Sequence, residues 1–488
     1  MSAAVAPDLT PLAPEPADAP AARPGGTTAP VTVAVRVARA LRRHPIAATG
    51  VVLVAAGALA PAAGVRGLPG VPGAPAPAVA LSLPAAYVAL SPLARTADAL
   101  CLLSSAQHAA VLATVVAAAA ALRVAAARRR VWVNGVRIRE RRSFPRAFGA
   151  ECVAAALTLA FLLVAYAAAV LGPRPMAGLA VADPDLVRVD FHSHTAASHD
   201  VPAWITPAWR RAWHAAAGYD LAFVSDHRAI AGAAVTAGNP RRAGDGLSLL
   251  PALEARLGTV HVIVLGVTAA DSALLPEDHM ERVLPGLERG GALPSGARPV
   301  TIATIPDPVF DVLTPAARDG AAALRGVEVA DGAPRGYGQA DRDGAAIAAR
   351  ASVLGIVPVV ASNHHGWGRT TAGWNLVRVP GWRAMTPDSL GAAVVAALRA
   401  GRRDLVTPVL RSRVAVPSAA PAGGPLGRAP ALALTAPAVA WETARELTGP
   451  ERVAWLAWIA AGTAAAAAAP TARRARSLRA PVRRARRG

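Results

Sequence analysis

The chain has 488 residues, 53% of them hydrophobic, which leaves room for two domains or more. Its two cysteines, Cys101 and Cys152, both lie in apolar stretches, which excludes a cysteine zinc ribbon and a disulfide scaffold. The formal net charge is +20, lysine is absent and alanine is very frequent, a composition typical of a GC-rich bacterial genome. Arginine in place of lysine therefore carries little chemical information.

The N-terminal third of the chain is predicted to be a membrane region. Residues 1–45 are rich in Ala, Pro and Thr and poor in large apolar side chains, which indicates a disordered tail. Three uncharged, mostly apolar stretches follow, each close to the length of about 20 residues that crosses a bilayer: 46–65, 99–122 and 152–171. A Pro/Gly-rich connection covers 66–98, and a loop with nine arginines and one glutamate covers 123–146.

The C-terminal part is predicted to return to the membrane. Residues 413–452 are interpreted as a Pro/Ala/Gly-rich linker, 453–469 as a short alanine-rich fourth span and 470–488 as a basic tail. Because arginines next to apolar spans mark the cytoplasmic side, both termini and the 123–146 loop are expected inside the cell, with the intervening domain on the outer face of the plasma membrane. Arginine runs also bind nucleic acid, but their position beside apolar spans favours topology, so no nucleic-acid partner is expected.

Between residues 183 and 412, strand-like apolar runs alternate with helical stretches. Such alternation predicts a parallel sheet covered by helices, so the fold class is α/β. The last expected helix starts with Thr386-Pro387-Asp388, which is typical of a helix N-terminus. Helices are expected over 206–217, 276–284, 314–324, 341–354 and 386–400.

Histidine residues gather where these strand-like runs begin or end. His192 and His194 follow the run 186–189, and side chains two residues apart on a strand point to one face, so both imidazoles can reach one metal ion. Such a pair alone is a weak signal. Ligands at the ends of several strands are typical of barrel enzymes. The other metal-type side chains near run ends are His199, His227, Glu254, His261, His364 and His365.

Over about residues 183–412 the sequence resembles the PHP (polymerase and histidinol phosphatase) family of metal-dependent phosphoesterases. The segment Asp190-Phe191-His192-Ser193-His194-Thr195-Ala196-Ala197-Ser198-His199 resembles the family motif Asp-Leu-His-x-His-Thr-x-x-Ser-Asp. Ser225-Asp226-His227 resembles its Thr-Asp-His, Pro251-Ala252-Leu253-Glu254 with His261 resembles its Gly-x-Glu and next-strand His, and Ser362-Asn363-His364-His365 resembles its closing Ser-Asp-x-His. The resemblance implies a distorted (β/α)7 TIM-like barrel, here joined to about four transmembrane helices.

Two positions depart from the family pattern. Ile305, in Thr304-Ile305-Pro306, stands where the family has a His before Pro, and Asn363 stands where it has Asp. Each change removes a ligand or a negative charge. The resemblance implies up to three metals, and these changes leave two or three divalent ions as the expectation.

Imidazole and carboxylate ligands without thiolate suit Zn, Mn or Fe. Asp226 is expected to act at the catalytic site by orienting a ligand. Arg228 and Arg369 flank ligand positions and are candidates for binding the substrate phosphate, although a plain surface arginine is the simpler interpretation of each. The metal ligands implied by the resemblance are His192, His194, His199, His227, Glu254, His261, Asn363 and His365.

Two adjacent metals can hold a bridging hydroxide and clamp a phosphoryl group, which requires no protein nucleophile. The expected function is hydrolysis of a phosphomonoester or phosphodiester, with a lipid headgroup, a cell-wall precursor or an external nucleotide as substrate. Ile305 and Asn363 keep a second hypothesis open, a catalytically degraded barrel that serves as a membrane-tethered binding or sensor module. A third hypothesis, a cytoplasmic barrel acting on nucleic acid, conflicts with the charge pattern.

Overall fold

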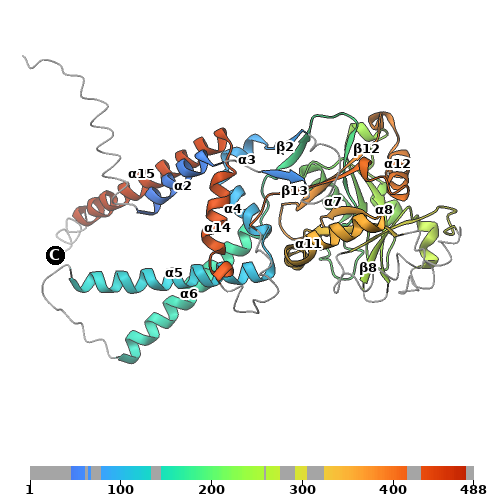
Figure 1. Ribbon diagram of the computed structural model, residues 1–488. Coiled ribbons are helices and arrows are strands. Elements are labelled where there is room, and N and C mark those ends of the chain that lie inside the picture. The colour runs from blue at the N-terminus through green and yellow to red at the C-terminus, as the bar shows by residue number, and fades with distance from the viewer. Residues whose placement is uncertain are drawn as a thin grey trace, which may run out of the picture. The chain divides into compact units, whose positions relative to one another are not determined.

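The computed structural model describes residues 45–60, 64–67, 78–132, 144–257, 260–274, 292–304, 324–414 and 430–479. Figure 1 shows the helices and strands coloured along the chain. The chain divides into two units, one formed by Gly50–Gly462 and the other by Met1–Thr49 together with Thr463–Gly488. The described strands all lie in the Gly50–Gly462 unit, and the site described below is built within that unit.

Two segments of the predicted membrane region are long and apolar enough to cross a membrane, as judged by length and composition. They are Ser105–Leu122 and Cys152–Leu171, and 11% and 0% of their residues are buried. The helices of this region are α2 (Pro45–Leu59), α3 (Ala85–Ala89), α4 (Ser91–Cys101), α5 (Ser105–Trp132) and α6 (Phe144–Leu171). The structure therefore supports two candidate spans where the sequence predicted about four.

The predicted spans 46–65 and 453–469 account for the difference. The helix α2 ends at Leu59 and has 15 residues, a length of about 22 Å against a hydrocarbon core of about 30 Å. The segment 453–469 lies within the alanine-rich helix α15 (Gly449–Arg479) and is not among the spans found in the described residues. The predicted span 99–122 starts later, because α4 runs through Cys101 and α5 begins at Ser105.

Two segments predicted as connections contain regular structure. The connection 66–98 contributes the end of β1 (Val65–Gly67), all of β2 (Val79–Ser82), α3 and the first part of α4. The linker 413–452 contains α14 (Thr435–Arg445), which is rich in the strong helix former alanine. Both predictions gave proline and glycine too much weight, because neighbouring residues in these segments pair with strands or pack as helices.

The described strands form two larger sheets and one small sheet. The six-stranded sheet has the order β1-β13-β12-β4-β5-β6, and the five-stranded sheet has the order β11-β10-β9-β8-β7. The small sheet pairs β2 with β3 (Gly178–Val181). The remaining strands are β4 (Leu186–Asp190), β5 (Leu221–Val224), β6 (Ser248–Pro251), β7 (Leu253–Leu257), β8 (Val260–Leu265), β9 (Val300–Ala303), β10 (Leu324–Asp331), β11 (Val357–Ala361), β12 (Gly373–Arg378) and β13 (Val406–Arg411).

Parallel pairing, which the sequence predicted throughout, covers only part of each larger sheet. The strands β4, β5 and β6 pair in parallel, and so do β9, β10 and β11. The strands β7, β8 and β9 are antiparallel neighbours, as are β4, β12 and β13. A short connection between β7 and β8 allows a hairpin, whereas parallel strands need a longer crossover.

The two larger sheets share one hydrophobic core. Val189 and Phe223 from one sheet and Ile302 and Val359 from the other belong to the same buried cluster, together with Leu390 from α12 (Pro387–Arg399). The outer faces are covered separately. Trp213 of α7 (Pro207–Ala216) packs on the six-stranded sheet, and Ile347 of α11 (Pro334–Leu354) packs on the five-stranded sheet.

The fold is α/β as predicted, but the described strands do not form one closed barrel. The two larger sheets are joined by isolated β-bridges, Ser193 with His364 and His227 with Glu254, rather than by continuous ladders. The second bridge joins two predicted metal ligands, and the first joins residues that lie next to predicted ligands in the sequence. The chain at these positions leaves regular strand geometry, with Arg228 and Asn363 at positive φ angles of 56° and 39°.

Several predicted helices match the structure. The prediction 206–217 corresponds to α7, capped by Thr206, whose side chain accepts a hydrogen bond from the Trp209 amide. The prediction 386–400 corresponds to α12, capped in the same way by Thr386. The prediction 341–354 began too late, because α11 starts at Pro334, a residue suited to a first helical turn. The remaining predictions, 276–284 and 314–324, lie outside the described residues except for Leu324, which begins β10.

Candidate metal centre

The metal centre is built where β4 ends. The chain continues from Asp190 through His192 and His194, both fully buried. Neighbouring segments hold this stretch in place, because the Asn363 amide donates to the His192 carbonyl at 2.9 Å and the Ser225 amide donates to the Ser193 carbonyl at 2.8 Å. The side chains of His192 and His194 point to the same side, as their spacing predicted, because their Nε2 atoms are 2.9 Å apart.

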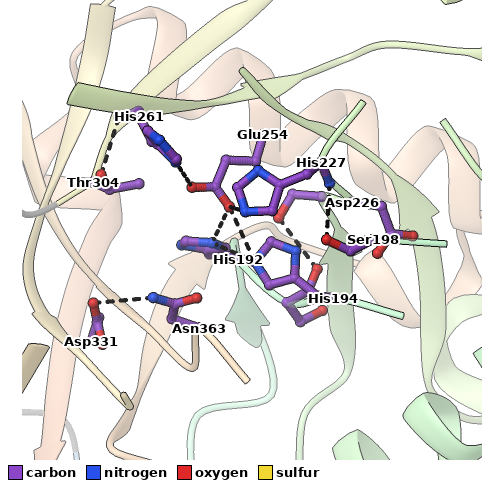
Figure 2. A network of polar contacts seen from close by, with 12 residues as sticks. His192, His194, Ser198, Asp226, His227, Glu254, His261, Thr304, Asp331 and Asn363 are labelled. Atoms are coloured by element: carbon purple, nitrogen blue, oxygen red, sulfur yellow. Dashed lines mark hydrogen bonds and ion pairs between the residues drawn. The ribbon is translucent and has the colours of Figure 1, made fainter. Parts of the chain in front are cut away.

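The carboxylate of Glu254 lies among the imidazole rings (Figure 2). Its Oε2 atom is 2.9 Å from Nε2 of His192, 3.1 Å from Nε2 of His194 and 3.4 Å from Nε2 of His227. Its other oxygen, Oε1, is 2.7 Å from Nδ1 of His261. Glu254 thus contacts histidines from three other parts of the fold, the ends of β4 and β5 and the strand β8.

A second carboxylate lies at the other side of the cluster. Oδ2 of Asp200 is 3.0 Å from Nε2 of His365 and 3.7 Å from Nε2 of His227. The ring of His365 packs on that of His194, with centroids 4.3 Å apart. Ser198 fixes the carboxylate by donating its hydroxyl proton to Oδ1 of Asp200 at 2.7 Å. The carboxylates of Asp200 and Glu254 therefore both approach Nε2 of His227.

Three groups of side chains in the described residues could each hold one metal ion. They are His194-His227-His365, His192-His194-Glu254 and His227-Glu254-His261, and the ligand atoms within each group lie within 4.8 Å of one another. Each pair of groups shares one residue. Glu254 is shared by the second and third groups, and because a carboxylate has two oxygens these two groups could hold one ion each. The number of ions expected from the sequence stays a prediction.

The chemistry of the side chains fits a divalent metal. The donors are imidazole nitrogens and carboxylate oxygens, the set that suits Zn, Mn or Fe. Nδ1 of His194 is buried and has no hydrogen-bond partner among the described residues, and the same holds for Oε2 of Glu328. Buried polar atoms normally have a partner, so atoms without one beside such a cluster are consistent with a ligand that completes the site.

Opposing effects set the charges at the centre. Burial disfavours a charge on His192, but Glu328 and Glu254 outweigh it and raise the pKa of His192 well above its ordinary value. Burial also opposes charge on Glu254, yet the neighbouring histidines lower its pKa well below the usual range. Burial lowers the pKa of His194 to about 3. The His194 ring is consequently neutral at pH 7, as a metal ligand must be.

Glu328 contacts His192 at the ring nitrogen opposite the one that faces Glu254. Its Oε1 lies 2.8 Å from Nδ1 of His192, and its side chain is fully buried on β10. Burial raises the pKa of Glu328 to about 7. A carboxylate on the far nitrogen of a ligand histidine fixes the tautomer and the ring orientation, so Glu328 is placed to aim Nε2 of His192 toward Glu254.

Asp226 binds the loop that carries His194. Its carboxylate accepts hydrogen bonds from the Thr195 amide at 2.5 Å and the Thr195 hydroxyl at 2.6 Å. Burial raises the pKa of Asp226 to about 6. Asp226 is outside the three groups but directly precedes His227 and binds the residue after His194, so its expected role in orienting a ligand stays a prediction.

The structure does not bring every expected site residue into the three groups. His199 is exposed, with its ring 5.3 Å from that of His227 between centroids. Asn363 donates from Nδ2 to Oδ2 of Asp331 at 3.2 Å. Arg228 is exposed and Arg369 is half-buried. Ile305 lies outside the described residues.

His364 and His365 are adjacent but lie in different surroundings. His365 contacts Asp200, as described above. His364 is buried against Trp213, with ring centroids 4.2 Å apart, and its Nε2 donates to the Trp367 carbonyl at 2.5 Å. His364 therefore does not replace the ligand that Asn363 fails to provide.

Arg210 is a buried residue that the sequence did not single out. Its Nη1 donates to Nδ1 of His364 at 2.5 Å, and its Nη2 donates to the carbonyls of His194 and His364. Burial lowers the pKa of Arg210 to about 9. One guanidinium group thus connects the ends of β4 and β11, the two strands that lead to His194 and His365.

Two further connections escaped the sequence analysis. Nε2 of His214 donates to Oδ2 of Asp190 at 2.8 Å, and the other carboxylate oxygen of Asp190 accepts from the Ser362 backbone amide at 3.1 Å. Asp200 was also not predicted as a site residue. It comes one residue after the first motif, and an acidic residue at that position was the only sign of it in the sequence. For Arg210 and His214, on a helix of ordinary composition, the sequence held no signal.

No family model and no curated protein matches this sequence. Similar solved structures include PsfC from Pseudomonas syringae, 16% identical, with 47% of this chain and 92% of that chain covered and a TM-score of 0.31. A two-domain protein from Bacteroides vulgatus containing a predicted PHP-like metal-dependent phosphoesterase is 14% identical (46% and 65% covered, TM-score 0.26). An amidohydrolase from Chromobacterium violaceum is 18% identical (40% and 89% covered, TM-score 0.25). At TM-scores this low the likeness carries no argument about activity.

Proposed function

We propose that this protein is a membrane-anchored, metal-dependent phosphoesterase that hydrolyses a phosphomonoester or a phosphodiester. The observation that carries the proposal is the position of Glu254, whose Oε1 contacts His261 while Oε2 contacts His192 and His194. A carboxylate whose two oxygens face different histidines is suited to bridge two metal ions. Adjacent metal pairs are typical of enzymes that cleave phosphoesters.

In this proposal some residues bind the metals and others orient the residues that bind them. The metals, when bound, would supply Lewis-acid polarisation of the phosphoryl group and activation of the attacking water. Glu328 and Asp226 orient His192 and the loop of His194 through the contacts described above. The proposed ligands that belong to the three groups are His192, His194, His227, Glu254, His261 and His365, to which we add Asp200.

Four residues named from the sequence keep their predicted roles only as proposals. His199 and Asn363 would need to turn toward the groups to act as ligands. Arg228 would bind the substrate phosphate from the exposed turn after His227, and Arg369 from the loop after His365. Guanidinium groups on both flanks of a metal centre match the geometry of a phosphate.

Membrane anchoring is supported by two helical segments. Ser105–Leu122 and Cys152–Leu171 have 11% and 0% of their residues buried, which suits lipid contact better than a core position. The arginines of the loop 123–146 lie between these two segments in sequence. By the positive-inside rule that loop is cytoplasmic and the metal centre lies on the outer face of the plasma membrane.

A distorted barrel made from part of the two larger sheets, with seven strands as the resemblance implied, stays a proposal. The shared core between the sheets and the two β-bridges support it, because Ser193–His364 and His227–Glu254 join the sheets at both sides of the metal centre. In such a barrel the ligands gather at the strand ends, where active sites of barrel enzymes lie.

Substitution of two ligand residues tests the proposal. The full-length protein with added Mn²⁺ should hydrolyse a chromogenic phosphoester, and His192→Ala and His227→Ala should each abolish the reaction. The exposed surface carboxylate Asp404, paired with Arg402, offers the control Asp404→Asn, which should leave the rate unchanged. Equal rates in wild type and both histidine variants would show that this centre is not the catalyst, and the binding-module hypothesis would then be favoured.

A further inference from the structure

The ends of the two candidate spans indicate where one surface of the membrane would lie. Because Ser105–Leu122 and Cys152–Leu171 are joined by the loop between them, Ser105 and Leu171 lie on the same side when both segments cross. Cys101, four residues before the first segment, touches Val170 at the end of the second, since Sγ of Cys101 is 3.6 Å from the carbonyl oxygen of Val170. When both segments cross a membrane, this contact lies at the boundary where they leave the lipid on the side of the metal centre.

Gly368 brings a metal-site loop to this boundary. A Cβ atom at Gly368 would lie 2.7 Å from Sγ of Cys101 and 3.0 Å from the Val170 carbonyl oxygen, so a larger residue would not fit. The φ angle of 57° also favours glycine. His365 lies three residues earlier, so the chain places its Cα within roughly 11 Å of Gly368. The metal centre is therefore close to the boundary.

The same loop is bonded to residues that flank the spans. The Thr370 hydroxyl donates to Oδ1 of Asp98, and Arg174, three residues after Leu171, donates from Nη2 to the Thr370 hydroxyl at 2.8 Å. Arg174 also pairs with Asp98 at 2.7 Å. Asp98 is on α4, just before the first candidate span, so side-chain bonds as well as close packing hold the loop at the boundary.

Two tryptophans are exposed on the loops that carry site residues. Trp367, next to Gly368, is 55% exposed, and Trp204 is 70% exposed. Their loops are in contact, because a Cβ at Gly366 would lie 3.1 Å from Cδ1 of Ile205. Large exposed aromatic side chains are uncommon on a protein surface, but tryptophan is enriched at membrane–water interfaces.

Positive charge accompanies the tryptophans. Nε and Nη1 of Arg174 are buried and have no hydrogen-bond partner among the described residues. Nε of Arg369 is also buried and has no such partner among these residues. Burial, reinforced by the charge of Arg174, lowers the pKa of Arg369. Arg174 is already paired with Asp98, so Arg369 is the guanidinium group that favours a further anion nearby, and an anion present at a membrane interface is lipid phosphate.

We propose that the metal centre opens on the membrane surface and that its substrate is a phosphoester of a membrane lipid, with Trp204 and Trp367 lying in the headgroup layer. This inference rests on the proposed phosphoesterase function and names its substrate class. In the reaction the oxygen of a water molecule bonds to phosphorus while the bond from phosphorus to the lipid oxygen breaks. A proton of that water ends on the lipid alcohol, so the products are the alcohol and a phosphate.

Soluble and membrane-bound phosphoesters distinguish the two sources of phosphate. The full-length protein, loaded with Mn²⁺, is placed in nanodiscs of phosphatidylcholine containing phosphatidic acid, and the products are followed by mass spectrometry. Glycerol 3-phosphate and glycerophosphocholine serve as the soluble counterparts. Because enzyme and lipid share one membrane, we expect the lipid to be hydrolysed about tenfold faster or more. Equal or faster turnover of the soluble esters overturns the lipid inference but leaves the phosphoesterase intact, whereas no turnover of any ester contradicts the phosphoesterase itself.

Tryptophan variants test the surface independently of activity. Brominated phosphatidylcholine quenches tryptophan fluorescence on contact, so the double variant Trp204→Phe/Trp367→Phe should lose a large part of the quenching seen in wild type. The double variant Trp204→Ser/Trp367→Ser should lower lipid turnover more than turnover of the soluble esters. Val353, 77% exposed at the end of α11, offers the control Val353→Ser, which should change neither ratio. Unchanged quenching in the Phe variant would overturn the inference.

Discussion

Oδ2 of Asp200 lies 3.0 Å from Nε2 of His365, and the two residues come from the loops that follow β4 and β11. His194 and His227 lie beside this pair, so Asp200 adds a negative charge to a group that otherwise consists of histidines. Neighbouring histidines and the Ser198 hydroxyl outweigh the effect of burial and lower the pKa of Asp200, so it is ionised at neutral pH.

Asp200→Asn should therefore weaken one metal position. We expect the affinity for the most weakly bound metal to fall about 10- to 100-fold, the range typical for loss of a supporting carboxylate. Metal per chain, measured by mass spectrometry after dialysis, should drop by about one relative to wild type. The exposed Asp404→Asn is the matched control. Full metal content in Asp200→Asn would show that Asp200 is a surface acid without a role in the centre.

Glu254→Gln should have a larger effect, because both oxygens of Glu254 face histidines and the substitution removes the charge while keeping the size. We expect metal affinity and phosphoester turnover to fall by more than about 100-fold, beyond what a supporting residue costs. Glu328→Gln should be milder, since Glu328 contacts only His192 among the metal-site residues. A Glu254→Gln protein that retains its metals would contradict the bridging role.

The adjacent histidines should separate stability from activity. His364 is buried among Trp209, Trp213 and Arg210, so His364→Ala should lower the free energy of unfolding by about 1–3 kcal/mol by leaving buried polar groups without partners. His365→Ala should keep the melting temperature within a few degrees and reduce metal content and turnover. Thermal unfolding of both variants, beside metal analysis, checks the difference. The reversed pattern would mean that the two histidines have exchanged roles.

Asp98 should make the protein sensitive to acid. Burial alone would raise its pKa, but Arg411 and Arg174, with hydrogen bonds from Thr370 and Tyr87, lower it below the ordinary value. A carboxyl whose pKa is lower in the folded state stabilises the fold above its unfolded pKa, about 3.9, and loses that contribution as the pH falls toward the folded pKa.

Asp98→Asn tests this dependence. At pH 7 the variant should be less stable by about 3–5 kcal/mol, the typical cost of leaving one partner of a buried ion pair alone. The difference in melting temperature between wild type and variant should shrink as the pH is lowered below about 4, because Asp98 of the unfolded wild-type chain then takes up a proton while Asp98 of the folded chain is still ionised. A difference that stays constant down to acidic pH would contradict a lowered pKa for Asp98.

Part of the centre follows directly from the sequence. The alternation of side chains on a strand is enough to place His192 and His194 on one side, and the acid after an apolar run points to Glu254. The choice between His364 and His365 depends on how the chain turns after β11, where Asn363 has a φ angle of 39°, and strand periodicity does not extend to such a residue. Arg210 and Glu328 act through contacts between elements distant in sequence, which no local pattern encodes.

The membrane prediction shows a related difference. Cys152–Leu171 is apolar along its whole length, and the sequence and the structure agree on it. Composition alone does not set where a helix stops, so the predicted span 46–65 extended past Leu59, where α2 ends. The segment 66–98 has proline and glycine throughout, yet Val79–Ser82 forms an edge strand because β3 offers it a partner.

A metal titration with simultaneous rate measurement tests the central claim most directly. Metal-free full-length protein is titrated with Mn²⁺ while bound metal per chain and hydrolysis of a chromogenic phosphoester are followed together, with Glu254→Gln in parallel. The account predicts that turnover rises with binding and levels off at two or three ions per chain, and that the variant stays inactive. A wild-type protein that binds no Mn²⁺ tightly, or that binds it without any hydrolysis, would contradict the account.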